Sequence, residues 1–405
     1  MDREVFKGEV EDRMQKIAFT FNFIFKPRQT LVVTNWAGKF NSCSTVVQKA
    51  TALLLFCATA LFLSSCNLLS PDKERLFKKS TVLMDTIVSI TVVSTSRDRA
   101  EKAINEAFRE LKRLEDIMNF YSEESEVSRI NRNAGIRPVK VSMDMIDIIE
   151  KAIYVSRLTD GAFDITTGPL TRLWDFQNNS PFPPLKVRGG NSPFNSPSYG
   201  KRGYGGVTDA TKKVPEPSEI RKALRLVNYR DIVINQKDST VFLKRKGMLI
   251  DLGGIAKGYG ADRAMEILKK NGINSCLVAI AGDIKVSGRK PDGSPWVIGI
   301  RHPRAEKGSD DIFTSLPLTD AAISTSGDYE RFFIKDGKRY HHIINPFTGY
   351  PSESTGGVSV ITEKGYLSDS LATAVFVLGP EKGMELLKRL GYKGIFITGD
   401  LKTYE

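Results

Sequence analysis

Apolar residues recur at helical spacing in two early stretches of the chain. Between residues 97 and 122 they return at steps of three and four, which predicts an amphipathic helix. The buried face of this helix would consist of Ala103, Ile104, Ala107, Leu111, Leu114 and Met118. A second helix is predicted over residues 143–161, with Gly161 as its candidate C-cap.

Strand-like runs rich in β-branched residues occupy much of the remaining chain. They lie at residues 80–94, 231–236, 239–245, 247–252, 275–288, 295–303 and 356–362, and further helices are predicted at 255–270 and 367–379. Helices and strands follow each other without a regular βαβ alternation, and short connections favour antiparallel pairing. We therefore expect an α+β fold with a mixed, largely antiparallel sheet and packed helices.

The start of the chain has the pattern of an export signal. Lys49 precedes an apolar run that is short for a membrane span and ends in Leu63-Ser64-Ser65-Cys66. This ending resembles a bacterial lipobox, so we expect lipidation at Cys66 and a protein exported and anchored to a bacterial membrane. A plain signal anchor with an incidental cysteine is the alternative.

The expected organisation has three parts. Residues 1–66 form an N-terminal extension with the signal peptide, 67–78 a polar tether, and 79–400 one domain. Within that domain, residues 177–213 are rich in Pro, Gly, Ser and Asn and read as a low-complexity insertion.

The positive charge does not indicate nucleic-acid binding. Of the formal net charge of +12, residues 1–66 contribute eight Lys and Arg against five Asp and Glu, and residues 177–213 contribute six against one. The rest of the chain is nearly balanced, and it lacks a basic stripe interleaved with aromatic residues. After cleavage before Cys66, Cys276 would be the one other thiol, which we interpret as a buried small residue, with a nucleophile as the alternative.

A diglycine turn before the helix at 255–270 is the first candidate for chemistry. Asp251 ends an apolar stretch, Gly253 and Gly254 permit a tight turn, and Lys257 lies in the first helical turn. Backbone N–H groups at a helix start attract phosphate, and a lysine there neutralises it. The alternative is a turn that serves packing only.

Oxygen donors on the helix at 367–379 form the second candidate. Asp369 and Thr373 are four residues apart and share one helix face. Such hard donors suit Mg²⁺, which keeps water and phosphate as its other ligands. In the alternative reading, Asp369 caps the helix and Thr373 bonds back to a carbonyl oxygen.

Two of the three histidines, His341 and His342, are adjacent in a polar segment. Histidine is the usual proton acceptor near neutral pH, although a structural role is the alternative. Together the three stretches indicate an enzyme that acts on a phosphate ester or anhydride.

Several motifs in order resemble the ApbE family, the FAD:protein FMN transferases. These are MDT, SEVSRIN, GAFDITTGPLTRLWDF, DLGGIAKGYGADRA, AGDI, STSGDYERFF, HHIINPFTGYP and SDSLATAVFVLG, spanning roughly residues 79–400. The resemblance implies Mg²⁺-dependent transfer of FMN from FAD to a Thr or Ser hydroxyl of an acceptor flavoprotein, with release of AMP. Such an acceptor would be a subunit of a respiratory membrane complex.

The resemblance also assigns roles to residues. It implies metal ligation by Asp369, Thr373 and the backbone carbonyl of Gly254, and His342 as the catalytic base. Asp283 belongs to a Gly-Gly-Asp-like motif near the site, and Lys257 neutralises the phosphates. Flavin contacts would come from Met84, Tyr121, Ala162, Phe163, Asp164, Asp251, Lys257 and Ile343.

Met84 would pack its polarizable thioether on the flavin or adenine ring, unless it fills a gap in the core. The chain departs from common family patterns at Asp85, Ala281 and Asn345. Two other activities remain compatible with these residues. One is an Mg²⁺-dependent FAD pyrophosphatase that releases FMN and AMP, and the other is a lipoprotein that binds FAD without turning it over.

Overall fold

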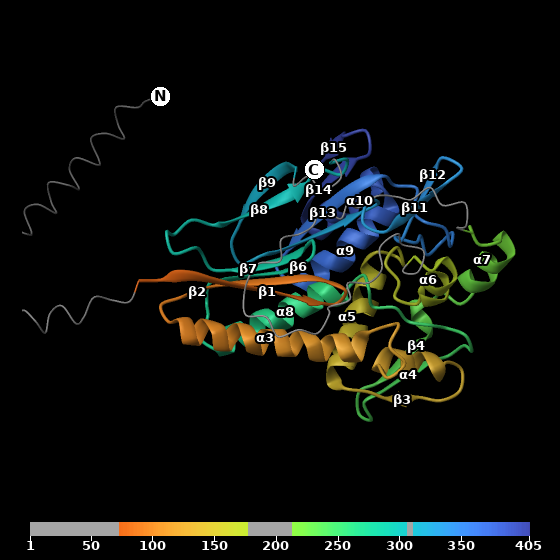
Figure 1. Ribbon diagram of the computed structural model, residues 1–405. Helices are drawn as coiled ribbons and strands as arrows, with labels where there is room; N and C mark the ends of the chain where they lie inside the picture. Colours follow the sequence, from red (N-terminus) through yellow and green to blue (C-terminus); the bar gives the residue numbers. More distant parts are fainter. Residues whose placement is uncertain (1–72, 177–212, 306–310) are drawn as a thin grey trace, which may run out of the picture. The chain divides into compact units, whose positions relative to one another are not determined.

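The computed structural model describes residues 73–176, 213–305 and 311–405 (Figure 1). The extension 1–66 with Cys66, and the insertion 177–213 except Lys213, lie outside these residues. Residues 72–405 form one compact unit. Within the described ranges, no helix combines the length and the hydropathy that crossing a bilayer requires.

An eight-stranded sheet forms the centre of this unit (Figure 1). Its order is β1 (Arg75–Leu83), β2 (Thr86–Ser94), β6 (Cys276–Ile280), β7 (Asp283–Ser287), β10 (Ala322–Gly327), β13 (Gly356–Thr362), β14 (Lys393–Thr398) and β15 (Thr403–Tyr404). Every neighbouring pair in it is antiparallel, which confirms the expected α+β class.

Three smaller antiparallel sheets are separate from the large one. They are β3 (Val139–Lys140), β5 (Thr240–Leu243) and β4 (Ile232–Asn235); β8 (Trp296–Arg301) and β9 (Ile312–Leu318); and β11 (Phe332–Lys335) and β12 (Lys338–His341). The last of these, a hairpin, leads directly into His342.

Helices cover the sheet and fill the other half of the unit. They are α3 (Arg97–Met118), α4 (Glu126–Arg132), α5 (Met143–Leu158), α6 (Gly168–Trp174), α7 (Pro217–Leu224), α8 (Ala256–Lys270), α9 (Gly365–Leu378) and α10 (Pro380–Leu390), with the short 3₁₀ helix η2 (Tyr229–Asp231). All six positions predicted for the inner face of α3 are buried. Each fully buried leucine there, such as Leu111, stabilises the fold by about 1.5–3 kcal/mol.

The Met-Asp-Thr corner is the turn of a hairpin. Leu83 pairs with Thr86, so Met84 and Asp85 form a two-residue loop with φ of 53° and 56°. Positive φ at both positions is the requirement of a type I′ turn, whose twist matches that of the strands. The expected single strand at 80–94 is therefore two strands, and β1 begins at Arg75, inside the range expected as tether.

The run at 275–288, expected as one strand, is likewise two strands, β6 and β7, which turn at Ala281 with φ of 52°. Two further local predictions were wrong. Helix α5 ends at Leu158, and Thr159 is its C-cap. Asp160, with φ of 50°, takes the left-handed position, and the Gly161 N–H donates to Ser156 O at 2.8 Å. This is the 6→1 bond of a Schellman motif, in which Gly161 follows the left-handed residue.

The second error concerns residues 247–252, which were expected as a strand. Here the Asn131 side chain takes the place of a partner strand, because its amide donates to Ile250 O at 3.0 Å and accepts from Ile250 N at 2.7 Å. Only Leu249 forms an isolated parallel bridge, with Thr167. Pairing between a side chain and the backbone does not produce a periodic pattern of apolar residues, so the sequence could not reveal it.

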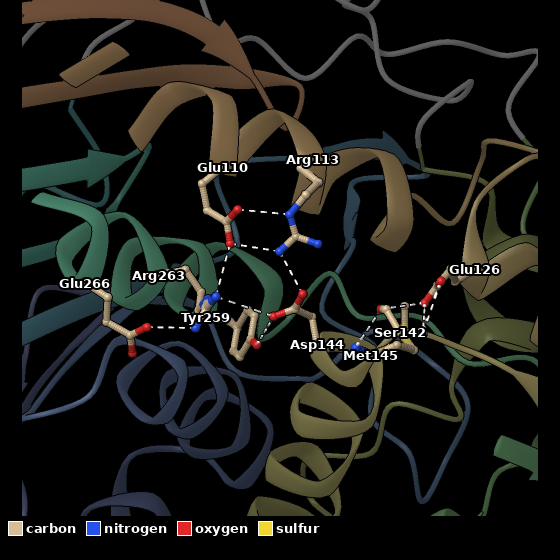
Figure 2. Close-up of polar contacts among 9 residues, drawn as sticks. All are labelled: Glu110, Arg113, Glu126, Ser142, Asp144, Met145, Tyr259, Arg263 and Glu266. Carbon is tan, nitrogen blue, oxygen red and sulfur yellow. Dashed lines mark hydrogen bonds and ion pairs between the residues drawn. The ribbon is translucent and has the colours of Figure 1, made fainter. Parts of the chain in front are cut away.

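Helix α8 is tied to its neighbours by a cluster of charges (Figure 2). Arg263 lies between Glu110 of α3, at 3.3 Å, and Asp144 of α5, at 3.7 Å. Arg113 reaches the same two carboxylates at 2.8 and 2.7 Å. The cluster fixes α8 against both helices.

Candidate active site

Helices α8 and α9 cross at two glycines. A Cβ atom on Gly258 would lie 2.1 Å from Gly365 O, and one on Gly365 would lie 2.3 Å from Gly258 O. Because real Cβ atoms do not approach backbone oxygen so closely, only glycine fits at either position. The first turns of the two helices therefore touch.

Asp369 of α9 uses this contact to reach the start of α8. Its Oδ2 accepts a hydrogen bond of 2.9 Å from the Gly258 N–H, and its Oδ1 lies 3.6 Å from Lys257 Nζ. Asp369 thus caps the neighbouring helix rather than its own. A carboxylate at a helix N-terminus is stabilised there by the helix dipole.

Lys257 is held between two buried carboxylates. Asp283, at the start of β7, lies 2.6 Å from Lys257 Nζ, and both Asp283 and Asp369 are 3% exposed. Burial raises the pKa of Asp369 to about 7, with the charge of Asp283 adding to the effect. Burial alone would lower the pKa of Lys257, but the two carboxylates raise it. When both aspartates are ionised, their two negative charges exceed the single positive charge of Lys257, so this buried cluster carries a net negative charge.

Thr373 lies close to the two other residues that were predicted to bind metal, Asp369 and Gly254. Thr373 Oγ1 donates to Asp369 O at 3.3 Å, as the structural alternative expected, and lies 3.3 Å from where a Cβ of Gly254 would stand. A carboxylate, a hydroxyl and a backbone carbonyl are hard oxygen donors that fit Mg²⁺. Within the described ranges, no group of three or more His, Cys, Asp or Glu side chains gathers into a metal cage. The donor set fits an ion that keeps other ligands.

The two adjacent histidines differ in their hydrogen bonding. His341 is buried, with Nε2 2.8 Å from Ser352 O and Nδ1 accepting from the Ile343 N–H at 3.3 Å. His342 Nδ1 is buried with no partner among the described residues. Since buried polar atoms are normally paired, this ring nitrogen is a candidate for chemistry.

The pKa of His342 is lowered to about 3, first by burial and then by the charges of Arg331 and His341. The imidazole is therefore neutral at pH 7. At the open end of the β11–β12 hairpin, the backbone N–H of His342 donates to the backbone oxygen of Arg331 at 3.0 Å, which keeps these two residues opposite each other. A neutral ring can accept a proton.

The stretch after α5 contacts the diglycine turn. Phe163 Cε2 lies 3.2 Å from where a Cβ of Gly254 would stand, and both Ala162 and Phe163 are buried. The Asp164 carboxylate accepts from the backbone and hydroxyl of Thr166, at 2.7 and 2.6 Å, and from the Tyr229 N–H at 2.9 Å. Asp164 therefore holds this loop in place, and its contact with flavin stays a prediction.

Asp251 and Tyr121 lie on the same side of the site. The Asp251 N–H donates to Ile165 O at 2.7 Å, and its side chain accepts from the Gly253 N–H at 2.9 Å. The pKa of Tyr121 is raised to about 12 by burial and by the charge of Asp251, although the residue is 48% exposed. Tyr121 lines a hollow of about 900 Å³ that Leu249 also borders.

The remaining predicted flavin contacts, Met84 and Ile343, are apolar. Met84 Cε lies 3.2 Å from where a Cβ of Gly260 on α8 would stand, so its thioether packs into the core, as the structural alternative expected. Ile343 is 6% exposed and follows His342. A ring contact by either residue stays a prediction.

Cys276 has the environment expected of a structural thiol. It is fully buried and free, and burial raises its pKa to about 12. A thiol that stays protonated is a poor nucleophile.

Two residues close to the site were missed by the sequence analysis. Arg331 lies inside the STSGDYERFF motif, and Asp262 lies inside DLGGIAKGYGADRA, but neither position was weighed.

The fold is α+β, and the site brings a lysine, two buried carboxylates and hard oxygen donors together next to a helix start. The sequence model of the ApbE family matches residues 84–396. This chain belongs to the ApbE family, which confirms the resemblance found in its motifs.

Curated relatives agree with this assignment. The FAD:protein FMN transferase of Klebsiella pneumoniae (strain 342) is 32% identical over 327 residues, covering 80% of this chain and 90% of the relative. That of Treponema pallidum (strain Nichols) is 30% identical over 345 residues, covering 81% and 86%.

Solved structures share the fold. The ApbE protein from Thermotoga maritima has a TM-score of 0.69 and 31% identity, covering 82% of this chain and 97% of that structure. The apo flavinyl transferase ApbE of Pseudomonas stutzeri has a TM-score of 0.66 and 28% identity, covering 83% and 95%.

Proposed function

We propose that this protein transfers FMN from FAD to a Thr or Ser hydroxyl of an acceptor flavoprotein, in an Mg²⁺-dependent reaction that releases AMP. The names of the relatives, FAD:protein FMN transferases, support the reaction class. The observation that carries the proposal is the position of Asp369, which reaches the Gly258 N–H at 2.9 Å and Lys257 Nζ at 3.6 Å.

The start of α8 would receive the diphosphate of FAD. The N–H groups of its first turn and the Lys257 ammonium attract phosphate oxygens. Asp283 holds the ammonium at 2.6 Å and so fixes its direction. Asp369, Thr373 and the Gly254 carbonyl would hold Mg²⁺, which when bound neutralises charge on the phosphates.

His342 would take the proton of the attacking hydroxyl. The hydroxyl oxygen forms a bond to the FMN phosphorus, the bond from that phosphorus to the AMP oxygen breaks, and AMP leaves with the electron pair. The proton moves to the neutral imidazole of His342, whose Nδ1 has no partner among the described residues. A bound diphosphate supplies negative charge that raises the pKa of this ring, countering the effect of Arg331.

Incubation of the purified protein with FAD and Mg²⁺, with and without an acceptor flavoprotein, tests the function. AMP together with a flavinylated acceptor supports the transferase. AMP and free FMN in equal amounts under both conditions indicate the pyrophosphatase. Unchanged FAD under both conditions indicates a lipoprotein that only binds FAD, and it contradicts the proposal.

We further propose that the protein is exported and anchored to a bacterial membrane by lipid on Cys66, where the acceptor is a subunit of a respiratory membrane complex. The lipobox-like ending of residues 63–66 supports this location. Mass spectrometry of the mature N-terminus and fractionation of Cys66→Ala test it. A variant that stays in the membrane fraction would contradict the lipid anchor.

A further inference from the structure

A second aspartate at the helix crossing mirrors the first. On α8, Gly258 and Asp262 are four residues apart, and on α9, Gly365 and Asp369 have the same spacing. The Asp369 carboxylate accepts from the Gly258 N–H, and the Asp262 carboxylate accepts from the Gly365 N–H, both at 2.9 Å. In each helix, a backbone N–H of the first turn therefore donates to an aspartate of the other helix.

Asp262 supplies the cap that α9 lacks. The residue before the helix, Lys364, gives no side-chain hydrogen bond to the first turn. Asp262 instead binds two successive N–H groups, Gly365 through Oδ1 at 2.9 Å and Tyr366 through Oδ2 at 3.0 Å. The first N–H groups of a helix need such partners.

Lys285 connects this cap to the sheet. Its ammonium forms an ion pair with Asp262, and it donates to Glu363 O, just before α9, at 3.1 Å. Both charged side chains are only 12% exposed. Lys285 is two residues after Asp283 on β7, so the two side chains share one face of the strand.

The same three elements thus meet twice. In the active site, α8, α9 and β7 contribute Lys257, Asp369 and Asp283. About one helical turn away, they meet again through Asp262, the start of α9 and Lys285. This second contact fixes the sliding and rotation of α9 on α8, and hence where the Asp369 carboxylate lies.

We propose that Asp262, held by Lys285, is a positioning residue for the metal-binding carboxylate Asp369. The inference rests on the proposed function, because it assumes that Asp369 binds Mg²⁺. A displacement of about 1 Å at such a site can lower activity about 100-fold. Loss of a supporting partner typically weakens metal affinity about 10- to 100-fold.

The test compares Asp262→Asn and Lys285→Met with the wild type. The matched control is Glu266→Gln, one turn further along α8, which removes only the exposed ion pair with Arg263 at 2.7 Å. Mg²⁺ binding is measured by calorimetry with and without FAD, well below the melting temperature. The Mg²⁺ concentration that gives half-maximal AMP release is measured alongside.

We expect Asp262→Asn to weaken Mg²⁺ binding and raise the half-maximal concentration about 10- to 100-fold. Lys285→Met should act in the same direction but less strongly, because it leaves both hydrogen bonds that the α9 N–H groups donate to Asp262. Glu266→Gln should match the wild type. If Asp262→Asn lowers the melting temperature but binds Mg²⁺ like the wild type, Asp262 is merely structural and the inference is wrong.

Two further outcomes separate this inference from the proposed function. If Asp262→Asn does not fold, the Mg²⁺ affinity of Lys285→Met tests the inference in its place. An affinity equal to that of Glu266→Gln overturns the inference. If the wild type binds Mg²⁺ but releases no AMP, the proposed function fails while the binding series still judges Asp262. A wild type that binds no Mg²⁺ under either condition contradicts both.

Discussion

Helix α8 takes part in two clusters of cationic and carboxylate side chains, one around Lys257 and one around Arg263. In the first, a single ammonium serves two buried carboxylates, Asp283 and Asp369. In the second, two guanidinium groups serve Glu110 and Asp144 at a more exposed place (Figure 2).

The pKa values respond in opposite directions. The pKa of Asp369 is raised to about 7 by burial and by Asp283, whereas the pKa of Glu110 is lowered by its hydrogen bond from Arg113. In the cluster around Arg263, the two guanidinium groups balance Glu110 and Asp144, while the third carboxylate, Glu266, is exposed to solvent. This cluster serves to join helices. The cluster around Lys257 has an excess of buried negative charge, which a divalent cation would neutralise. Imbalance of buried charge therefore distinguishes the candidate site from the structural cluster.

The largest effect is expected from removing the Asp369 carboxylate, which contacts both Gly258 and Lys257 of α8. Asp369→Ala takes away a proposed Mg²⁺ ligand, so Mg²⁺-dependent AMP release should fall about 1000-fold. The release of AMP from FAD by the purified variant, followed by chromatography, measures this effect. Turnover at the wild-type rate would remove the metal assignment.

The next largest effect is expected from His342, whose ring nitrogen Nδ1 has no partner in the part of the chain that the structure describes. His342→Ala should leave FAD binding intact and slow transfer to the acceptor about 100- to 10,000-fold, the usual range for a general base. Flavin fluorescence reports binding, and fluorescence of the acceptor band on a gel reports transfer. An unchanged transfer rate would place the base elsewhere.

The lowered pKa of His342 also predicts a pH effect on stability. With a folded pKa of about 3 and an ordinary value of 6.5, the unfolded chain binds the proton more readily between these values. Wild-type stability therefore decreases as pH falls below 6.5, and His342→Asn lacks this loss. From pH 8 to pH 5, the unfolding free energy of the variant should gain up to about 2 kcal/mol relative to the wild type.

Denaturant unfolding at both pH values, without FAD and Mg²⁺, measures this difference. Burial also lowers the pKa of His341, but His341 is present in both proteins, so its contribution cancels in the comparison. A gap between the wild type and His342→Asn that is the same at pH 8 and pH 5 would contradict the assigned environment of His342.

The smallest effect is expected in the cluster around Arg263. Glu110→Gln removes one partly exposed carboxylate, and Asp144 remains as a partner for both guanidinium groups. The unfolding free energy should fall by only about 0.5–1 kcal/mol, with AMP release unchanged. A large loss of activity in this variant would show that the two clusters are not separate in function.

Local pattern predicted helices α3, α5, α8 and α9 and about half of the strands, whereas α4, α6, α7 and α10 were not predicted. The periodicity of residues 97–122 predicted α3 because its stripe of apolar residues faces one core. Helix α8 and the antiparallel strands were likewise foreseeable from periodicity and short connections. The hairpin at Met84 was missed because type I′ turns usually signal themselves with Asn or Gly, and this one has Met-Asp.

The way the elements meet could not be predicted from the sequence. Nothing local to Gly258 and Gly365 indicates that they touch, because the contact joins residues far apart in the chain. The resemblance to the ApbE family supplied the candidate site residues, but these did not include Asp262 or Arg331. Their surroundings become visible only when α8, α9, β7 and the β11 hairpin are assembled.

The central claim is that Asp369, Thr373 and the Gly254 carbonyl hold a divalent cation on the diphosphate of FAD. Crystals grown with FAD and Mn²⁺ in place of Mg²⁺ would locate the ion directly by its anomalous scattering. We predict one strong peak bound by these three groups, with Lys257 still paired to Asp283. A peak elsewhere in the protein, or FAD bound with no ion beside Asp369, would contradict the account.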